Sequence, residues 1–168
     1  MGVYRSLMYD LKTTATDKSE LYRDLLSAAD ALTAGEPDGV ANMANVAALL
    51  FDWLPGLNWA GFYRNIGGEL VLGPFQGKAA CIRIALGQGV CGTAAATATS
   101  QRVDDVHAFP GHIACDAASA SELVVPVVIA GKVIAVIDLD SPRRARFDAD
   151  DQTGIEALAR LIAARICP

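Results

Sequence analysis

The sequence predicts an α+β protein in which helices pack on a central, mainly antiparallel sheet. Two observations lead to this. The predicted elements follow the order ααβββαββα, and short turns join the strands as in hairpins, instead of the helices of βαβ crossovers. A third observation is the length of 168 residues without internal repeats, linkers or low-complexity tracts. It predicts one domain over 1–168, with residues 1–16 as an N-terminal extension.

Two amphipathic helices are expected before the first strand. The first begins after Asp17, which forms a capping-box pattern with Glu20, and ends at Gly35–Pro37. The second begins at Asp38 and stops before Pro55. Apolar residues at helical spacing predict the buried faces: Leu21, Leu25, Ala28, Ala29 and Leu32 in the first helix, and Met43, Val46, Leu50 and Trp53 or Leu54 in the second.

A hairpin follows, with strands over 57–64 and 69–75 and a turn between them. Alternation places Trp59, Gly61 and Tyr63 on one face of the first strand. Because two rings flank a residue without a side chain, this face offers either room for a ligand or ordinary core aromatics.

The middle of the chain collects the sulfur-bearing residues. The expected elements there are a strand over 78–85, a short helix of small residues over 87–99 and a loop over 100–120. They carry, in this order, Cys81, Cys91, and Cys115 with both histidines, His107 and His112. A loop of this composition tolerates movement, which a cysteine needs if it must travel between partners.

Two longer strands, over 122–129 and 132–140, are expected to form a second hairpin. On the second strand Ile134, Val136, Asp138 and Asp140 share a face. Buried carboxylates are costly unless solvated or paired, so we expect a polar cavity there. A plain two-residue turn would place Glu122 on the opposite face. A three-residue loop with Gly131 left-handed and a bulge would bring all three carboxylates together, and this is the prediction.

A last helix is expected after a cap at Asp148 or Asp150. Its buried stripe is predicted to consist of Ile155, Leu158, Ala159, Ile162 and Ile166. Cys167 follows at the frayed end, and we expect it to be incidental to the chemistry.

Charge and hydropathy exclude several classes of protein. A net charge of −5 and a pI of about 4.9, without a basic stripe, argue against nucleic-acid and anionic-membrane surfaces. No apolar run approaches the ~18 residues of a membrane span, and no signal-peptide core is visible, so a cytosolic protein is predicted. Cytosolic thiols are normally reduced. Each cysteine is therefore expected to be a buried small hydrophobe, a metal ligand or a reactive thiol.

Three cysteine chemistries are compatible with these residues. A zinc site has weak support, because the three cysteines are ten and twenty-four residues apart and form no Cys-x-x-Cys, although Cys115 could still converge with the histidines. Hydrolysis by a Cys–His pair would use Cys91, which gains thiolate character at a helix N-terminus. Thiol redox chemistry, with one cysteine attacking and another resolving through a disulfide, fits best. Nearby acids would then protonate a departing oxygen.

The chain resembles the free methionine-(R)-sulfoxide reductases, which are built on a GAF domain. The match runs from about residue 58 to 162, and the two preceding helices fit the same family. The shared motifs are Asn58-Trp-Ala-Gly-Phe-Tyr63, Gly73-Pro-Phe-Gln-Gly-Lys-Ala-Ala-Cys81, Gly87-Gln-Gly-Val-Cys-Gly92, His112-Ile-Ala-Cys-Asp116, Ser121-Glu-Leu-Val-Val-Pro126 and Val136-Ile-Asp-Leu-Asp-Ser-Pro142. GAF domains in general share the Pro126 and Asp138–Asp140 neighbourhood. The three cysteines together with Glu122 make the match specific.

The resemblance implies a single GAF domain with a six-stranded sheet, no cofactor and no metal. It implies reduction of free L-methionine (R)-S-oxide, with Cys115 as the nucleophile, Cys81 as the resolving thiol that forms a disulfide with it, and Cys91 as an assisting or alternative partner. Thioredoxin would regenerate the thiols, and a homodimer through the N-terminal helices is compatible with the family.

The resemblance also assigns the pocket. It implies that the carboxylates hold the substrate and protonate its oxygen, with Glu122 and Asp140 as catalytic groups. The remaining substrate-binding residues would be Trp59, Tyr63, Asp104 and Asp138. A sulfoxide oxygen leaves poorly until it is protonated, and crowded, desolvated carboxylates keep a proton near neutral pH. The other carboxylates can accept hydrogen bonds from an α-ammonium group, which favours the free amino acid.

Two rival hypotheses remain at this point. One is a GAF module that binds a small ligand such as a nucleotide, and the other is a redox switch without turnover. Both predict that no methionine is produced. Two cysteines are candidates for the nucleophile. The position at a helix N-terminus favours Cys91, whereas the resemblance favours Cys115.

Overall fold

The computed structural model describes residues 13–111 and 118–167. The helices are α1 Lys18–Thr33, α2 Gly39–Trp53, α3 Gly89–Thr97 and α4 Ala149–Ile162, with short 3₁₀ turns at Val106–Ala108 and Ala163–Arg165. The strands are β1 Trp59–Ile66, β2 Glu69–Gly77, β3 Arg83–Ala85, β4 Gln101–Val103, β5 Ser121–Ile129 and β6 Lys132–Ser141. Among the helices so described, none combines the length and apolar character needed to cross a membrane.

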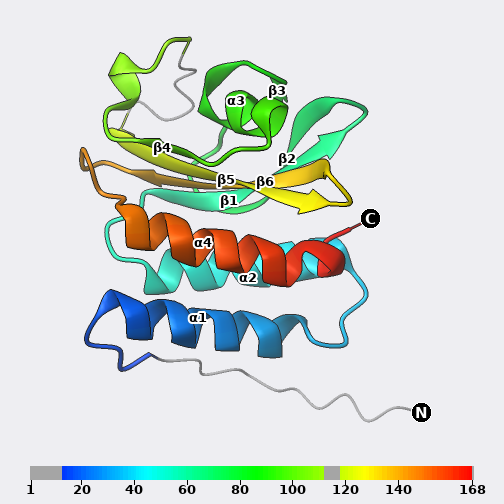
Figure 1. The fold of residues 1–168 in the computed structure, drawn as a ribbon, viewed down its shortest axis with the longest axis vertical. Helices are drawn as coiled ribbons and strands as arrows, with labels where there is room; N and C mark the ends of the chain where they lie inside the picture. Colours follow the sequence, from blue (N-terminus) through cyan, green and yellow to red (C-terminus); the bar gives the residue numbers. More distant parts are fainter. Residues whose placement is uncertain (1–12, 112–117, 168) are drawn as a thin grey trace.

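The strands form one six-stranded sheet in the order β3-β2-β1-β6-β5-β4, with every neighbouring pair antiparallel. Figure 1 shows α2 and α4 against one face of this sheet and α3 on the other, with α1 as a further layer behind α2 and α4. The predicted α+β class and the six-stranded antiparallel sheet are confirmed.

An aspartate begins each of the three long helices. The side chain of Asp17 accepts a hydrogen bond from the backbone N–H of Glu20, and that of Asp38 accepts one from Ala41. At α4 the cap is Asp148, which forms a reciprocal capping box with Asp151. These caps fix where the helices start, as the sequence predicts.

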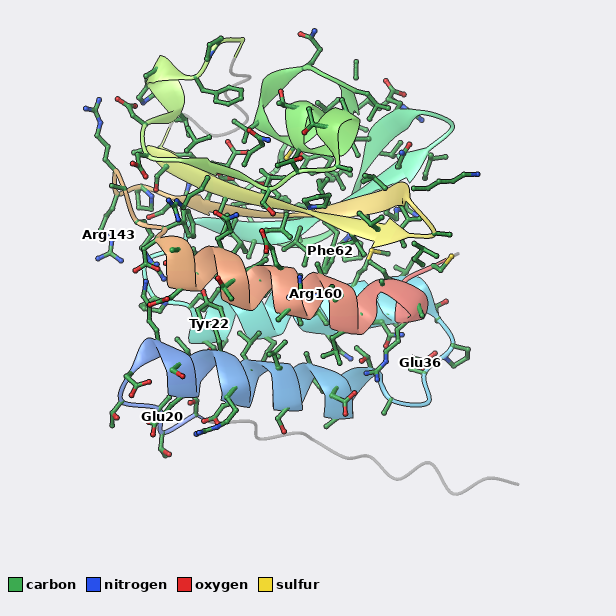
Figure 2. All side chains as sticks on the ribbon, viewed as in Figure 1. Glu20, Tyr22, Glu36, Phe62, Arg143 and Arg160 are labelled. Carbon is green, nitrogen blue, oxygen red and sulfur yellow. The ribbon has the colours of Figure 1, made fainter. Side chains whose placement is uncertain are left out.

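A buried polar cluster joins α1 to α4. The Asp151 side chain, 1% exposed, accepts a hydrogen bond of 2.7 Å from the Tyr22 hydroxyl and pairs with Lys18 at 2.7 Å and Arg146 at 3.0 Å. With the backbone N–H of Asp148, this buried carboxylate has four donors and is satisfied. The Tyr22 ring, labelled between α1 and α4 in Figure 2, lies against the Cα of Gly154, where a Cβ would collide with it.

The two faces of the sheet have different cores. On the α2 and α4 face, Phe62, Leu123, Ile137 and Leu139 pack with apolar residues of all three long helices. Figure 2 labels Phe62 between the sheet and α4. The other face carries a smaller cluster that includes Trp59, Tyr63, Leu70 and Val136 with residues of α3.

The hairpin between β5 and β6 brings the carboxylates to one face, by a different device from the one predicted. The turn has two residues, Ala130 and Gly131, with φ of 49° and 77°, and Ile129 pairs with Lys132 across it. The register shifts by one between Val128↔Val133 and Val127↔Ala135, so Ile134 is an extra residue in a bulge. The prediction of a three-residue loop is therefore wrong, whereas the prediction that the three carboxylates share a face is confirmed.

The bulge also corrects the position of Ile134. Its side chain packs with the cluster on the α2 and α4 face, whereas Val133 and Val136 belong to the opposite cluster. Ile134 thus does not share a face with Val136, Asp138 and Asp140 as predicted, because the extra residue reverses the alternation at that point.

Three further boundaries differ from prediction. The strand expected over 78–85 contains only β3, and Cys81 lies in the connection before it. The helix expected over 87–99 spans Gly89–Thr97, ending where Ala98 takes a left-handed conformation with φ of 51°. The loop expected over 100–120 contains β4, the sixth strand, which pairs with Leu123 and its neighbours on β5. A strand of three residues is too short to produce a visible alternation.

Candidate active site

Two paired strands place the three carboxylates. Glu122 on β5 lies opposite Asp140 on β6, and Asp138 lies opposite Val124 two residues along the same face. β1 supports them from the other side, since Gly61 pairs with Asp138 and Trp59 with Asp140. Glu122 and Asp138 are buried, at 7% and 6% exposure, whereas Asp140 is half-buried.

Helix α3 brings Cys91 onto this cluster. The Cys91 Sγ lies 3.8 Å from Glu122 Oε1, and the reactive atoms of Cys91, Glu122 and Asp138 lie within 4.8 Å of one another. The approach depends on Gly92, where a Cβ would collide with the carbonyl oxygen of Ala85 at the end of β3. The predicted convergence of a cysteine and acids is thus observed for Cys91.

Burial dominates the acid–base properties of this cluster. Desolvation, followed by the charges of Asp138 and Asp140, raises the pKa of Glu122 well above its usual value. Desolvation also raises the pKa of Asp138 to about 6, while hydrogen bonds to Cys91 and Glu122 act in the opposite direction. Burial therefore favours the protonated form of both carboxyls, compared with a carboxyl in water. The Asp138 Oδ1 is buried without a hydrogen-bond partner, so it can accept a hydrogen bond from a ligand.

The expectation that Cys91 gains thiolate character is wrong. Desolvation and the neighbouring charges of Asp138 and Glu122 raise the pKa of the Cys91 thiol well above its usual value. The position near the N-terminus of α3 is real, but burial, followed by the nearby carboxyls, opposes a thiolate more strongly than the helix dipole favours it.

An aromatic stack covers the start of β1. The Trp59 ring stacks on Phe75 with centroids 5.2 Å apart and on Tyr63 with centroids 5.9 Å apart. The Trp59 indole N–H donates to the Lys78 carbonyl oxygen at 3.1 Å. The space over Gly61 is not open to a ligand, because a Cβ there would meet Phe75 and lie 2.8 Å from Trp59 Cη2. Sequence reasoning missed Phe75, although the alternation along β2 carries a weak signal for it.

The other cysteines divide into two kinds. Cys81, half-buried in the connection between β2 and β3, is disulfide-bonded. Cys91 and Cys167 carry free thiols, the first buried and the second exposed. The predicted nucleophile Cys115 and the nearby His112 lie outside the described residues.

The remaining predicted residues lie at the rim. Asp104 directly follows β4, whose last residue Val103 pairs with Glu122, and its side chain is exposed. His107 is exposed in the 3₁₀ turn, where its backbone N–H donates to Asp105 Oδ1 at 3.1 Å. A contact that sequence reasoning missed is the hydrogen bond of 3.1 Å from Asn58 Nδ2 to Ser119 Oγ, which ties the start of β1 to the segment before β5.

Within the described ranges, Cys91, Glu122 and Asp138 are the group that could hold a metal ion. A thiolate and two carboxylates would suit a divalent ion such as zinc. Any ion would have to displace the protons that burial holds on Cys91 and Glu122.

Comparison with known proteins identifies the fold family. The family model described as "GAF domain" matches residues 15–166. The chain belongs to the GAF domain family. The free methionine-R-sulfoxide reductase of Escherichia coli (strain K12) is 52% identical over 142 residues, which cover 84% of this chain and 86% of the relative. The free methionine-R-sulfoxide reductase of Saccharomyces cerevisiae is 44% identical over 154 residues, covering 87% of this GAF domain and 86% of the relative.

Solved structures extend the same similarity. The structure of free methionine-R-sulfoxide reductase from Neisseria meningitidis in complex with its substrate matches this GAF domain with a TM-score of 0.91 and 44% identity. The match covers 95% of this chain and 96% of that one. The resemblance stated from the motifs is thus confirmed, and it extends beyond residues 58–162 on both sides.

Proposed function

We propose that this GAF domain is an enzyme that reduces free L-methionine-(R)-sulfoxide to methionine. The observation that carries the proposal is a buried carboxylic acid, Glu122, packed beside Asp138 and Cys91, where burial raises its pKa well above the usual value. Reduction of a sulfoxide needs such an acid, since its oxygen leaves only after protonation. The similarity to reductases named for this substrate, over most of each chain, supports the same assignment.

The two buried acids take different roles in the proposed reaction. Glu122 donates a proton to the sulfoxide oxygen. Asp138, with its unpartnered Oδ1, and the half-buried Asp140 accept hydrogen bonds from the substrate's α-ammonium group. A methionine sulfoxide within a peptide lacks that charge and would leave Asp138 unsatisfied, so the free amino acid is preferred.

The rings and Asp104 complete the proposed pocket. Trp59, stacked on Tyr63 and on Phe75, would form with Tyr63 a buried aromatic wall beside the carboxylates for the apolar part of the substrate. Asp104 lies next to the strand that pairs with Glu122, at the exposed rim. From there it can interact with the charged end of the amino acid.

The proposed nucleophile is Cys115, and Cys81 is the resolving thiol. The sulfur of Cys115 attacks the sulfoxide sulfur, releases methionine and becomes a sulfenic acid. Cys81 then condenses with it, forming a disulfide and releasing water. The disulfide at Cys81 agrees with this role, and so do the free thiols of the other described cysteines, Cys91 and Cys167. The protonated Cys91 is a poor nucleophile and assists beside Glu122.

The cycle closes with an external dithiol, and thioredoxin is the proposed reductant. A cytosolic location, where such reductants operate, is part of the same proposal. Association of two copies through the N-terminal helices is compatible with it and does not affect the chemistry above.

The test is methionine release from free L-methionine-(R)-sulfoxide with thioredoxin, thioredoxin reductase and NADPH. Wild type is compared with Cys115→Ser and with the matched control Cys167→Ser, and the (S) epimer serves as the substrate control. We expect turnover of the (R) epimer only, abolished in Cys115→Ser and unchanged in Cys167→Ser.

Each alternative result has a distinct meaning. Turnover that survives Cys115→Ser would keep the activity but move the attack to another cysteine. A reduced wild type that releases no methionine would refute the enzyme and leave a ligand-binding or redox-sensing GAF domain.

A further inference from the structure

The edge of the sheet next to Cys81 carries exposed apolar side chains. Ile82, the next residue, is 71% exposed, which makes it the most exposed large apolar side chain of the part of the chain that the structure describes. Leu86, at the other end of β3, is 37% exposed. Together with Cys81 we call Ile82 and Leu86 the β3 edge. Exposed apolar side chains beside a disulfide-bonded cysteine are suited to contact with another molecule.

The backbone at this edge is also open to a partner. β3 is a terminal strand of the sheet, bonded on one side to β2 through the register Leu70↔Ile84. An extended segment of another protein can lie along such a strand. Cys81 is half-buried in the connection that leads into this strand, so its sulfur lies close to where the segment would lie.

The charge of this region differs from that of the whole chain. The chain has a net charge of −5, but the stretch that carries β3, residues 70–100, contains no aspartate or glutamate and includes Lys78 and Arg83. Arg83 pairs with Glu69 at 2.8 Å, and both side chains are largely exposed, so this ion pair is weak and open to exchange. The region therefore complements an acidic partner.

We propose that the β3 edge is the docking surface for an acidic protein dithiol reductant, whose thiolate attacks the sulfur of Cys81. The proposal rests on the disulfide cycle of the proposed function and adds the partner's surface and the sulfur that it attacks. The alternatives are attack on the other sulfur of the disulfide and reduction by any small thiol without docking.

The electrons and atoms balance in two steps. The reductant's first thiolate attacks the Cys81 sulfur, forms a mixed disulfide and expels the partner cysteine as a thiolate, which takes up a proton. The reductant's second thiol then loses its proton and attacks the sulfur of the reductant's first cysteine in the mixed disulfide. This attack expels Cys81 as a thiolate. The reductant leaves as a disulfide, oxidised by two electrons, and both cysteines of this chain are reduced.

The first experiment traps the intermediate on the wild-type protein. Thioredoxin whose second reactive cysteine is replaced by serine cannot complete the second step, so the mixed disulfide accumulates. Peptide mapping by mass spectrometry is expected to find thioredoxin attached to Cys81. Attachment to Cys115 or Cys91 would overturn the proposal.

The second experiment separates docking from chemistry. We expect Ile82→Asp to raise the KM for thioredoxin by about tenfold, as befits the loss of one buried aliphatic side chain, and to leave turnover driven by dithiothreitol within about twofold of wild type. The matched control is Phe51→Asp on α2, where a large apolar side chain is 39% exposed on the other side of the sheet. Phe51→Asp should change neither reaction.

Several results would count against the β3 edge. An unchanged KM for thioredoxin in Ile82→Asp, or an equal fall of both reactions, would overturn it, and if this variant does not fold the trapping experiment decides alone. Sodium chloride should weaken the thioredoxin-driven reaction and not the dithiothreitol-driven one. If wild type produces no methionine with dithiothreitol, the proposed function itself fails, which is a different result from failed docking.

Discussion

The two faces of β6 perform opposite tasks within one strand. Toward α2 and α4 it presents Ala135, Ile137 and Leu139, all buried among apolar side chains. Toward α3 it presents Val136, Asp138 and Asp140, and the first carboxylate is as deeply buried as many core residues. The first face stabilises the fold by apolar burial. On the second face, burial raises the pKa of a carboxyl above its value in water. Substitutions on the two faces should therefore separate stability from activity.

The sharpest separation uses two adjacent residues of β5. Glu122→Gln removes the proton donor and should lower kcat at least about 100-fold, since general acid catalysis supplies 10²–10⁴. Leu123→Ala, on the opposite face, should lose about 2–5 kcal/mol of unfolding free energy through the cavity that it creates. Methionine release and urea denaturation are measured on both proteins.

Each variant serves as the control for the other. Glu122→Gln should unfold at a urea concentration close to that of wild type, and folded Leu123→Ala should turn over at close to the wild-type rate. Full activity in Glu122→Gln would remove this residue from the proposed chemistry.

The second prediction concerns the pH dependence of stability. The folded state raises the pKa of Asp138 from 3.8 to about 6, so between these values folded protein binds the proton more tightly than unfolded protein. The stability from this proton is fully present below about pH 4 and is lost as the pH rises through about 6. In Asp138→Asn this loss should be absent, a difference of roughly 3 kcal/mol between pH 4 and pH 7 at most. Urea denaturation at four pH values measures it, and parallel curves for the two proteins would contradict the assignment.

The third prediction tests the packing of the helices on the other side of the molecule. Gly154→Ala places a methyl group against the Tyr22 ring, so the ring must shift and its hydrogen bond to Asp151 weakens. Overpacking of this kind costs about 1–3 kcal/mol of unfolding free energy. Thermal unfolding measures the loss, with Thr153→Ala at the exposed neighbouring position as control. Because the sheet separates this site from Cys91, kcat should not change, and a parallel loss of activity would show that the two faces are coupled.

The smallest expected effect is at the surface. A hydrogen bond from Lys18 lowers the pKa of Asp148 to about 2, so its contribution to stability is present above about pH 4 and lost as the pH falls through 2. The side chains of Asp148 and Lys18 are 56% and 36% exposed, so solvent screens the pair. Asp148→Asn, which keeps a capping side chain, should lose less than about 1 kcal/mol at pH 7, and less again in 1 M salt. A loss larger than that of Gly154→Ala would reverse the proposed order of contributions.

The helices and hairpins could be predicted because their signals are local. Asp17, Asp38 and Asp148 cap helices wherever such residues precede an amphipathic run, and each occurs as expected. The three residues of β4 gave no such signal, because only the pairing with β5, about twenty residues later in the chain, makes them a strand.

The sequence allowed us to predict which residues meet at the site, but not which of them carry a proton. The common face of the carboxylates follows from alternation and a register shift, although the shift lies at Ile134 and not in the turn. The thiol state of Cys91 does not follow from its position on α3. It depends on Glu122 and Asp138, which other strands bring against it, and on the exclusion of water by all of these elements together. The roles of Cys115, Cys81 and Asp104 remain predictions that the first experiment tests.

The bulge at Ile134 takes up one residue without changing which side chains of β6 face α3. Deleting Ile134 would join Val133 to Ala135 in a regular ladder and keep the pairs from Val127↔Ala135 to Ser121↔Ser141 in register, so Asp138 and Asp140 should keep their face. Drawing Ile134 into the ladder instead would pair Glu122 with Leu139 and turn both aspartates into the helical layer. In this hairpin, a gain or loss of one residue should therefore be harmless only where a bulge absorbs it.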